Sequence, residues 1–190
     1  MWKRRLYFNF HYLGKPPWDT GIPVPELVDF MANHNAGCAL DLGCGTGTNM
    51  KAFLEAGWTV DGVDIAFLAT KNAKEKIRGF HDRGRVFTSE VTDLEFLEGK
   101  YDLIYDIGCF HGLDDQSRIK YVENIERLLN RNGFFLIYGF YKSDGTSFGI
   151  DSMDMDRFRA LLKITDRLES VDERGRSAVF IEFQRCEKCS

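Results

Sequence analysis

Short apolar runs alternate with stretches of helical periodicity along the chain after residue 36. The apolar runs predict strands at residues 38–42, 59–64, 86–89, 101–107 and 133–141. Helical patterns between successive strands are typical of a parallel sheet that helices cover on both faces. The pattern therefore predicts an α/β fold for most of the chain.

The clearest helical pattern covers residues 116–129, where apolar side chains recur at spacings of three and four. Asp114 and Asp115 stand before this stretch as candidate N-caps. Asn132 and Gly133 follow it, and this pair is the expected helix stop.

Two shorter helices are predicted between the first strands. One covers residues 50–56 and is closed by Gly57, and the other covers residues 66–78 and is closed by Gly79. The link at residues 89–100 is short and acidic, so we expect no full helix there.

The final part of the chain has a different pattern. Residues 153–164, "MDMDRFRALLKI", predict a helix. The runs "RLESVDE" (167–173) and "SAVFIEFQR" (177–185) are extended, and the turn at residues 174–176 separates them. Two extended runs around a glycine-containing turn predict an antiparallel hairpin and not another parallel unit.

Residues 1–35 are expected to form a lid or cap ahead of an α/β core at residues 36–190. They contain all four prolines, which fix φ and remove backbone donors, so "GKPPWDTGIPVP" predicts an ordered but irregular loop. A helix is predicted at residues 25–33. Trp18 lies in the middle of the loop, where an aromatic side chain needs a surface to cover.

Length and charge narrow the class of protein. A chain of 190 residues with 44% hydrophobic residues can bury a single core, so we expect one domain. The net charge of -4 argues against a nucleic-acid partner, because such proteins gather Lys and Arg on one face. Lys3, Arg4 and Arg5 beside apolar residues predict the solvated edge of an amphipathic terminal segment.

The sequence also indicates a compartment. No apolar run approaches the roughly 20 residues that cross a bilayer, and no signal peptide is recognisable, so we expect a cytoplasmic protein without a membrane partner. An odd number of cysteines favours reduced thiols over a disulfide framework. "CEKC" has the spacing of half a zinc site but no second pair follows, so no metal is expected. The cysteines are Cys38, Cys44, Cys109, Cys186 and Cys189.

A glycine-rich turn follows the first predicted strand in "ALDLGCGTGTNM". In open parallel sheets the first strand-to-helix turn is a common ligand site, and Gly43, Gly45 and Gly47 occupy it. A dinucleotide fingerprint needs glycine at the sixth position, where this chain has Thr48. Asp41 precedes the loop and suits a ligand with a positive amino group, with anchoring of the loop as its alternative role.

The second predicted strand adds a carboxylate. "TVDGVD" ends at Asp64, whose side chain can accept both hydroxyls of a ribose, and Ile65 follows as an apolar surface for adenine. S-adenosylmethionine carries an ammonium, a ribose and no phosphate, so it fits this combination. Because NAD needs the same acid, the distinction between the two ligands depends on the glycine loop and on the fourth predicted strand.

These segments resemble the motifs of class I S-adenosylmethionine-dependent methyltransferases. "LDLGCGTG" is similar to the first motif of that family, "VDGVDI" to the second, "VTDL" to the third and "YDLIYDIGCFHGL" to the fourth. "LLNRNGFFLIYGF" resembles the stretch that leads into strand five. The resemblance implies a Rossmann-like seven-stranded sheet, mostly parallel with an antiparallel last strand, with helices on both faces and an N-terminal cap.

A narrower resemblance concerns the acceptor. "PPWDTGIPVPELV" and "DIGCFHGL" look like the small-molecule branch near thiopurine, thiol and tellurite methyltransferases. In that branch the N-terminal segment folds over the cofactor, and the matching tryptophan is Trp18. A small-molecule methyl acceptor is therefore implied as the partner of this chain.

The resemblance also implies roles for individual residues. The glycine loop places backbone against the methionine part, Asp64 takes the ribose, and Asp93 with Leu94 meets the adenine, although Asp93 could simply cap a turn. The backbone near Asp106 and Ile107 would close the pocket around the ammonium. The implied cofactor-binding residues are Trp18, Asp41, Gly43, Cys44, Gly45, Gly47, Asp64, Ile65, Asp93, Leu94, Asp106 and Ile107.

The end of the fourth predicted strand is where the acceptor chemistry is expected. Methyl transfer is an in-line displacement that needs no metal, and only some acceptors need a general base. His111 is the candidate base, with a hydrogen-bonded shelf under the pocket as the alternative role. Phe110, His111 and Tyr141 are candidate substrate contacts, although aromatic side chains in strands are often core residues. Cys109 is expected to be an apolar filler.

The same stretch disfavours nucleic-acid substrates. Amino-methyltransferases of DNA and RNA carry two prolines and an aromatic residue after the first acid, whereas this chain has Asp106-Ile107-Gly108-Cys109. C5-pyrimidine enzymes use a Pro-Cys pair, and Gly108 stands in place of that proline. Two alternatives to the enzyme stay open: a protein that binds S-adenosylmethionine without turnover, and a nucleotide-dependent oxidoreductase.

Overall fold

The computed structural model describes residues 2–143, 146, 148–171 and 175–185. The chain divides into two compact units, Met1–Leu94 and Glu95–Ser190. Each unit is described by itself below. Cys186 and Cys189, and part of the predicted turn at residues 174–176, lie outside the described residues.

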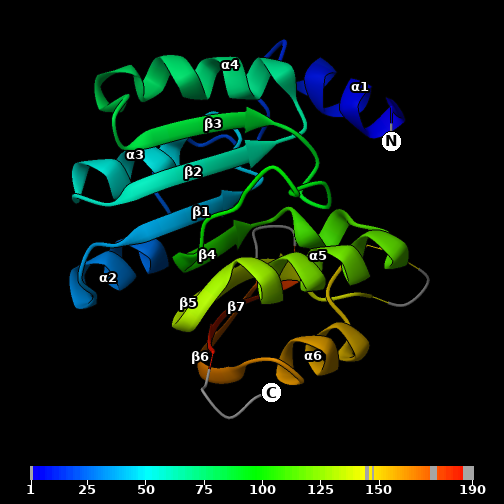
Figure 1. The fold of residues 1–190 in the computed structure, drawn as a ribbon. Helices are drawn as coiled ribbons and strands as arrows, with labels where there is room; N and C mark the ends of the chain where they lie inside the picture. Colours follow the sequence, from blue (N-terminus) through cyan, green and yellow to red (C-terminus); the bar gives the residue numbers. More distant parts are fainter. Residues whose placement is uncertain (1, 144–145, 147, 172–174, 186–190) are drawn as a thin grey trace. The chain divides into compact units, whose positions relative to one another are not determined.

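Three parallel strands form the sheet of the N-terminal unit (Figure 1). They are β1 (Cys38–Leu42), β2 (Thr59–Asp64) and β3 (Gly84–Thr88), with β2 in the middle. The helices α3 (Thr48–Glu55) and α4 (Phe67–Lys76) connect them. The first two strands have the predicted bounds, whereas β3 begins two residues early because Gly84 already pairs with Val60.

The packing of α3 on β2 explains a glycine in the second motif. A Cβ atom at Gly62 would lie 2.3 Å from Sδ of Met50, a fully buried side chain of α3. Glycine therefore lets the helix approach the strand closely, which brings the start of α3 and the end of β2 to the same edge of the sheet.

The segment before β1 has two helices and an irregular link. They are α1 (Trp2–His11) and α2 (Pro25–Asn33), and the latter starts with proline in its first turn and has the predicted bounds. Residues 12–24 form turns and bends, as the prolines predict. No residue of α1 is buried, so this helix leaves both its basic and its apolar side chains accessible.

The C-terminal unit contains four strands. They are β4 (Tyr101–Ile107), β5 (Leu129–Phe140), β6 (Lys163–Val171) and β7 (Ser177–Gln184). β4 and β5 pair in parallel, whereas β7 runs antiparallel to both β5 and β6. The predicted antiparallel hairpin is therefore confirmed.

Helical segments connect the strands of this unit. A 3-10 helix, η2 (Phe110–Gly112), follows β4 and leads into α5 (Asp115–Leu128), and α6 (Ser152–Arg159) precedes β6. The side chain of Asp114 accepts the backbone N–H of Ser117, so the predicted N-cap of α5 is confirmed. Residues 89–100 form no helix, as their composition predicts.

The strand order is β3-β2-β1-β4-β5-β7-β6. This is a mixed seven-stranded sheet that is mostly parallel and has its last strand antiparallel to its neighbours. The predicted fold class is confirmed.

Two predicted helix ends are wrong. The helix at residues 66–78 ends at Lys76, and Gly79 lies inside the 3-10 helix η1 (Arg78–Phe80) instead of closing α4. The helix that contains "MDMDRFRALLKI" ends at Arg159, because the chain from Lys163 onward pairs with β7. Tertiary pairing thus overrides the local helical pattern.

The expected stop of the long helix is also wrong. α5 ends at Leu128, because Leu129 is already extended and belongs to β5. Asn132, with φ of 62°, lies inside β5, where the pairing with β4 is irregular. The Asn132-Gly133 pair therefore accommodates a bulge in a strand and does not end a helix.

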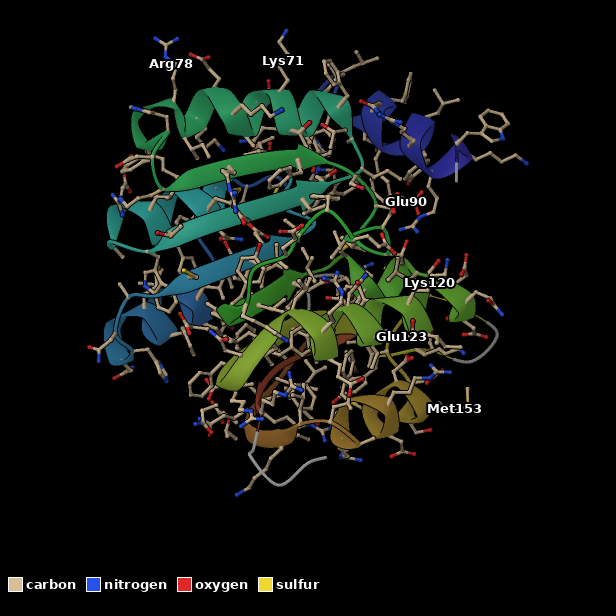
Figure 2. All side chains as sticks on the ribbon, in the orientation of Figure 1. Lys71, Arg78, Glu90, Lys120, Glu123 and Met153 are labelled. Carbon is tan, nitrogen blue, oxygen red and sulfur yellow. The ribbon has the colours of Figure 1, made fainter. Side chains whose placement is uncertain are left out.

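Charged side chains mark the solvent faces of the connecting helices. Figure 2 shows Lys71 pointing outward from α4, and Lys120 and Glu123 on α5 are also exposed. Among the described residues, no helix is both long enough and apolar enough to cross a membrane.

Candidate functional site

The glycine loop between β1 and α3 turns as tightly as its sequence predicts. Gly43, Gly45 and Gly47 have φ angles of 83°, 53° and 76°, a region that residues with a Cβ rarely adopt. The backbone N–H groups of Gly43 and Cys44 both donate to the carbonyl oxygen of Val63, at 2.8 and 3.0 Å. The loop is thereby tied to the end of β2.

Asp64 makes a second connection between β2 and the loop. Its carboxylate accepts the backbone N–H of Gly45 at 2.9 Å and that of Ala66 at 2.8 Å. The side chain is buried, and burial raises its pKa although both hydrogen bonds oppose the shift. The structure places Asp64 beside the glycine loop, as expected, and its role in ribose binding stays a prediction.

The N-terminal segment covers the same loop. A Cβ atom at Gly45 would lie 3.0 Å from the hydroxyl oxygen of Tyr12, and that hydroxyl accepts the indole N–H of Trp18 at 3.2 Å. Burial and the nearby carboxylate of Asp64 raise the pKa of Tyr12, so its hydroxyl stays protonated. Tyr12 is therefore the aromatic residue that lies directly over the loop, whereas Trp18 bonds to Tyr12 and is 48% exposed.

Sequence analysis missed Tyr12. Its signal is the aromatic run "YFNFHY" before the proline-rich stretch, which places a hydroxyl-bearing ring just ahead of the irregular link. Only the tertiary contact with Gly45 distinguishes Tyr12 from the other aromatic residues of this run.

Polar contacts hold the N-terminal segment on the loop. The hydroxyl of Thr46 donates to the carboxylate of Asp19 at 2.8 Å, and the backbone N–H of Val24 donates to the side-chain oxygen of Asn49 at 3.1 Å. Lys76, at the end of α4, donates to the hydroxyl oxygens of Thr46 and Thr48 at 2.9 and 2.7 Å. Its pKa is lowered by desolvation. Sequence patterns carry no signal for these long-range pairs.

The remaining predicted cofactor residues of this unit differ in exposure. Asp41, Cys44 and Leu94 are buried, Ile65 is half-buried and Asp93 is exposed. Asp41 is the penultimate residue of β1, directly before the loop. The roles of these residues in cofactor binding stay predictions.

In the C-terminal unit, the carboxylate of Asp106 builds the turn after β4. It accepts the backbone N–H groups of Cys109 and Phe110 at 2.7 and 3.0 Å and the hydroxyl of Tyr121 at 2.8 Å. The side chain is fully buried, and burial raises its pKa to about 7 despite these bonds. Asp106 therefore holds η2 in place. Ile107, the last residue of β4, is half-buried.

His111 is held in one orientation by β5. Its Nδ1 atom accepts the backbone N–H of Phe140 at 3.3 Å, so the neutral ring carries its proton on Nε2. Burial, with smaller contributions from Arg176 and Arg118, lowers the pKa of His111 to about 4. A group with this pKa is neutral near pH 7 and is a weak base.

The other two predicted substrate contacts have different surroundings. Phe110 is fully buried, and its ring packs against the rings of Tyr121 and Phe158, at centroid distances of 5.0 and 5.2 Å. The hydroxyl of Tyr141 bonds to Arg167 and Glu169 on β6. These contacts place Phe110 in the core and Tyr141 in a polar surface cluster.

The rings beside His111 are Phe140 and Phe148. Their centroids lie 5.3 and 4.3 Å from that of the imidazole. Sequence analysis missed both. Phe140 directly precedes the candidate residue Tyr141, so its place near the site could have been inferred from the sequence. Phe148 lies in a loop, and the path of a loop cannot be predicted from periodicity.

A buried ion pair stabilises the backbone around His111. The guanidinium of Arg118 lies 2.6 Å from the carboxylate of Asp154, and both side chains are almost completely buried. Arg118 also donates to the carbonyl oxygens of Leu113 and Gly149, at 3.0 and 2.8 Å. This arginine thus connects α5, α6 and the backbone next to His111.

Comparison with known sequences places the chain among methyltransferases. Residues 39–133 match the family described as "Methyltransferase domain". The chain is 29% identical over 124 residues to "Probable thiol methyltransferase 2" of Arabidopsis thaliana, covering 63% of this chain and 54% of that protein. It is 28% identical over 138 residues to "Thiocyanate methyltransferase 1" of Brassica oleracea, covering 70% and 61%. The matches thus span less than two thirds of these relatives.

Solved structures show the same fold. The 1,6-didemethyltoxoflavin-N1-methyltransferase of Burkholderia thailandensis has a TM-score of 0.81 and 21% identity, covering 97% of this chain and 88% of that one. The N-methyltransferase NodS of Bradyrhizobium japonicum WM9 has a TM-score of 0.80 and 14% identity, covering 96% and 98%. Both crystals contain S-adenosylhomocysteine.

Proposed function

This chain belongs to the methyltransferase-domain family, and from that premise we propose that it transfers the methyl group of S-adenosylmethionine to a small-molecule acceptor. The observation that carries the proposal is the glycine loop, held by the carboxylate of Asp64 and covered by the hydroxyl of Tyr12. It supports binding of an adenosine joined to a cationic amino acid.

The residues of the loop fit this cofactor. The three glycines place no side chain between the loop backbone and the methionine part, and Asp64 brings a buried carboxylate to the end of β2, where a ribose can bond to it. Asp41 adds a second buried carboxylate one strand away. Carboxylates next to the site favour a cationic ligand over a pyrophosphate, which speaks against the oxidoreductase alternative.

When bound, the cofactor supplies an electrophilic methyl group on a positively charged sulfur. The acceptor uses a lone pair to form the new bond while the sulfur–methyl bond breaks and its electron pair stays on sulfur. This displacement needs alignment and exclusion of water more than it needs proton transfer. In the C-terminal unit, the rings of Phe140 and Phe148 supply apolar surface beside His111.

The names of the relatives suggest the kind of acceptor. The plant proteins are named for thiols and thiocyanate, and the Burkholderia enzyme for a toxoflavin precursor. We therefore favour a small sulfur or nitrogen nucleophile. The net charge of -4 and the absence of proline after Asp106 support an acceptor other than nucleic acid. We also propose that the chain acts as one functional domain in the cytoplasm.

Binding and turnover can be tested separately. Calorimetry should detect binding of S-adenosylmethionine and of S-adenosylhomocysteine, but not of NADH. Release of S-adenosylhomocysteine is then assayed with a panel of thiols, thiocyanate, amines and phenols. Lack of binding contradicts the whole proposal. Tight binding without turnover on any acceptor favours the alternative, a binding protein without catalytic activity.

A further inference from the structure

The two nitrogen atoms of the buried His111 imidazole face different surroundings. Nδ1 accepts the backbone N–H of Phe140, and a Cβ atom at Gly139 would lie 3.2 Å from Nδ1, so this edge faces β5. The opposite edge faces Gly108, where an added Cβ would lie 3.5 Å from Cε1 and 4.0 Å from Nε2. Glycine therefore leaves the Nε2 edge without a covering side chain on this side.

The position of Gly108 relates the Nε2 edge of the imidazole to the expected ligand site. Gly108 follows β4 directly, with φ of 87°, and in open α/β sheets ligands bind beyond the carboxyl ends of the strands. The backbone N–H of Phe140 can only donate, so Nδ1 must be the acceptor and Nε2 must carry the proton. His111 thus directs an N–H donor toward the space next to Gly108.

Charged groups from several elements lie around the imidazole ring of His111. Arg118 on α5 is paired with Asp154 on α6, and Asp106 on β4 is covered by three donors. Arg176, just before β7, lies with its guanidinium carbon 3.8 Å from the centroid of the Phe140 ring, which itself packs on His111. Burial is the largest cause of the lowered pKa of His111, and both arginines lower it further.

We propose that His111 is a hydrogen-bond donor to the methyl acceptor rather than a base, and that this N–H donor favours an acceptor that binds as an anion. This inference rests on the proposed function and deepens it. A thiolate or thiocyanate attacks with its own lone pair, the sulfur–methyl bond of the cofactor breaks, and no proton has to leave.

Two acceptors that differ in charge test the selection. Thiocyanate is anionic and dimethyl sulfide is neutral throughout the working pH range. We expect kcat/KM to be higher for thiocyanate, because an N–H donor stabilises an anionic acceptor more than a neutral one.

Two substitutions of His111 separate its two nitrogens. Asn places its oxygen near the position of Nδ1, which keeps an acceptor for Phe140 but removes the donor, whereas Gln can retain a donor near Nε2. We expect His111→Asn to lose more than tenfold in kcat/KM for thiocyanate, and Gln to retain more of it than Asn. Equal losses, or a larger loss in Gln, contradict a donor role.

The tautomer of His111 can be determined without an activity assay. Nitrogen NMR of the folded chain near pH 7 should show His111 protonated at Nε2 and unprotonated at Nδ1. A Nδ1–H tautomer or an imidazolium overturns the inference, as does an acid limb near pH 6.5 in kcat/KM for thiocyanate. Turnover of dimethyl sulfide alone overturns this inference but leaves the proposed function intact. No turnover on any acceptor contradicts both.

Discussion

The carboxylate of Asp64 accepts the backbone N–H of Gly45 at a distance of 2.9 Å, so the end of β2 holds the middle of the glycine loop. The same carboxylate is the group that we expect to bind the ribose. One side chain thus shapes the loop and is available to the ligand that the loop would hold, which makes it the most direct point for a substitution.

Asp64→Ala should weaken binding of S-adenosylhomocysteine by about 1 to 3 kcal/mol, because it removes the ribose hydrogen bonds and releases the N–H of Gly45. Calorimetry measures the change. Glu55→Ala, at an exposed position of α3, is the control and should bind normally. An unchanged affinity in Asp64→Ala would show that the ligand is bound elsewhere.

Gly45→Ala should destabilise the fold, since the new methyl group would lie 3.0 Å from the hydroxyl oxygen of Tyr12 at a φ of 53°. The backbone contribution alone is about 1 kcal/mol. Adding Tyr12→Phe should restore part of the loss, because the hydroxyl is then gone. Urea unfolding of the two single variants and the double variant gives the coupling. Strict additivity of the two changes would mean that Tyr12 does not lie over the loop in solution.

Arg118→Met should destabilise the chain by about 3 kcal/mol, because the buried carboxylate of Asp154 loses its partner at 2.6 Å and keeps only the partly exposed Arg157, at 2.9 Å. The double variant Arg118→Met with Asp154→Leu should recover part of this loss, since no fully buried charge then remains at this position. Chemical denaturation measures both. A double variant that is less stable than Arg118→Met would indicate that the hydrogen bonds of Arg118 to Leu113 and Gly149 dominate.

The raised pKa of Asp106 predicts a pH dependence of stability. Its pKa rises from 3.8 to about 7 on folding, so the folded state holds the proton more tightly. The stabilisation is complete below pH 4 and is lost as the pH rises through 7. Asp106→Asn mimics the neutral form and should therefore gain stability relative to the native chain as the pH rises from about 4 to 7.

Urea unfolding of the native chain and Asp106→Asn across this pH range tests the sign. His111 contributes to both chains in the opposite direction, because its pKa falls to about 4 on folding, and its effect cancels in the difference between them. A difference that stays constant with pH would show that Asp106 is ionised in the folded state throughout.

Local patterns determined a large part of the fold. β1, β2 and β4 have the predicted bounds, because each is a short apolar run between residues that favour turns or helix starts. The glycine loop follows from three glycines at alternate positions, since positive φ angles need no distant partner. The sequence by itself therefore determined the fold class and the place of the candidate site.

The tertiary structure alone decided what individual side chains do there. Phe110 points into the core, Tyr141 bonds to β6, and Tyr12 rather than Trp18 lies over Gly45. His111 is set as a donor by a backbone N–H that comes from Phe140, 29 residues away. Such roles depend on groups that are distant in the sequence, and periodicity carries information only about near neighbours. Packing between remote segments is therefore what converts the motifs into a site with a defined chemistry.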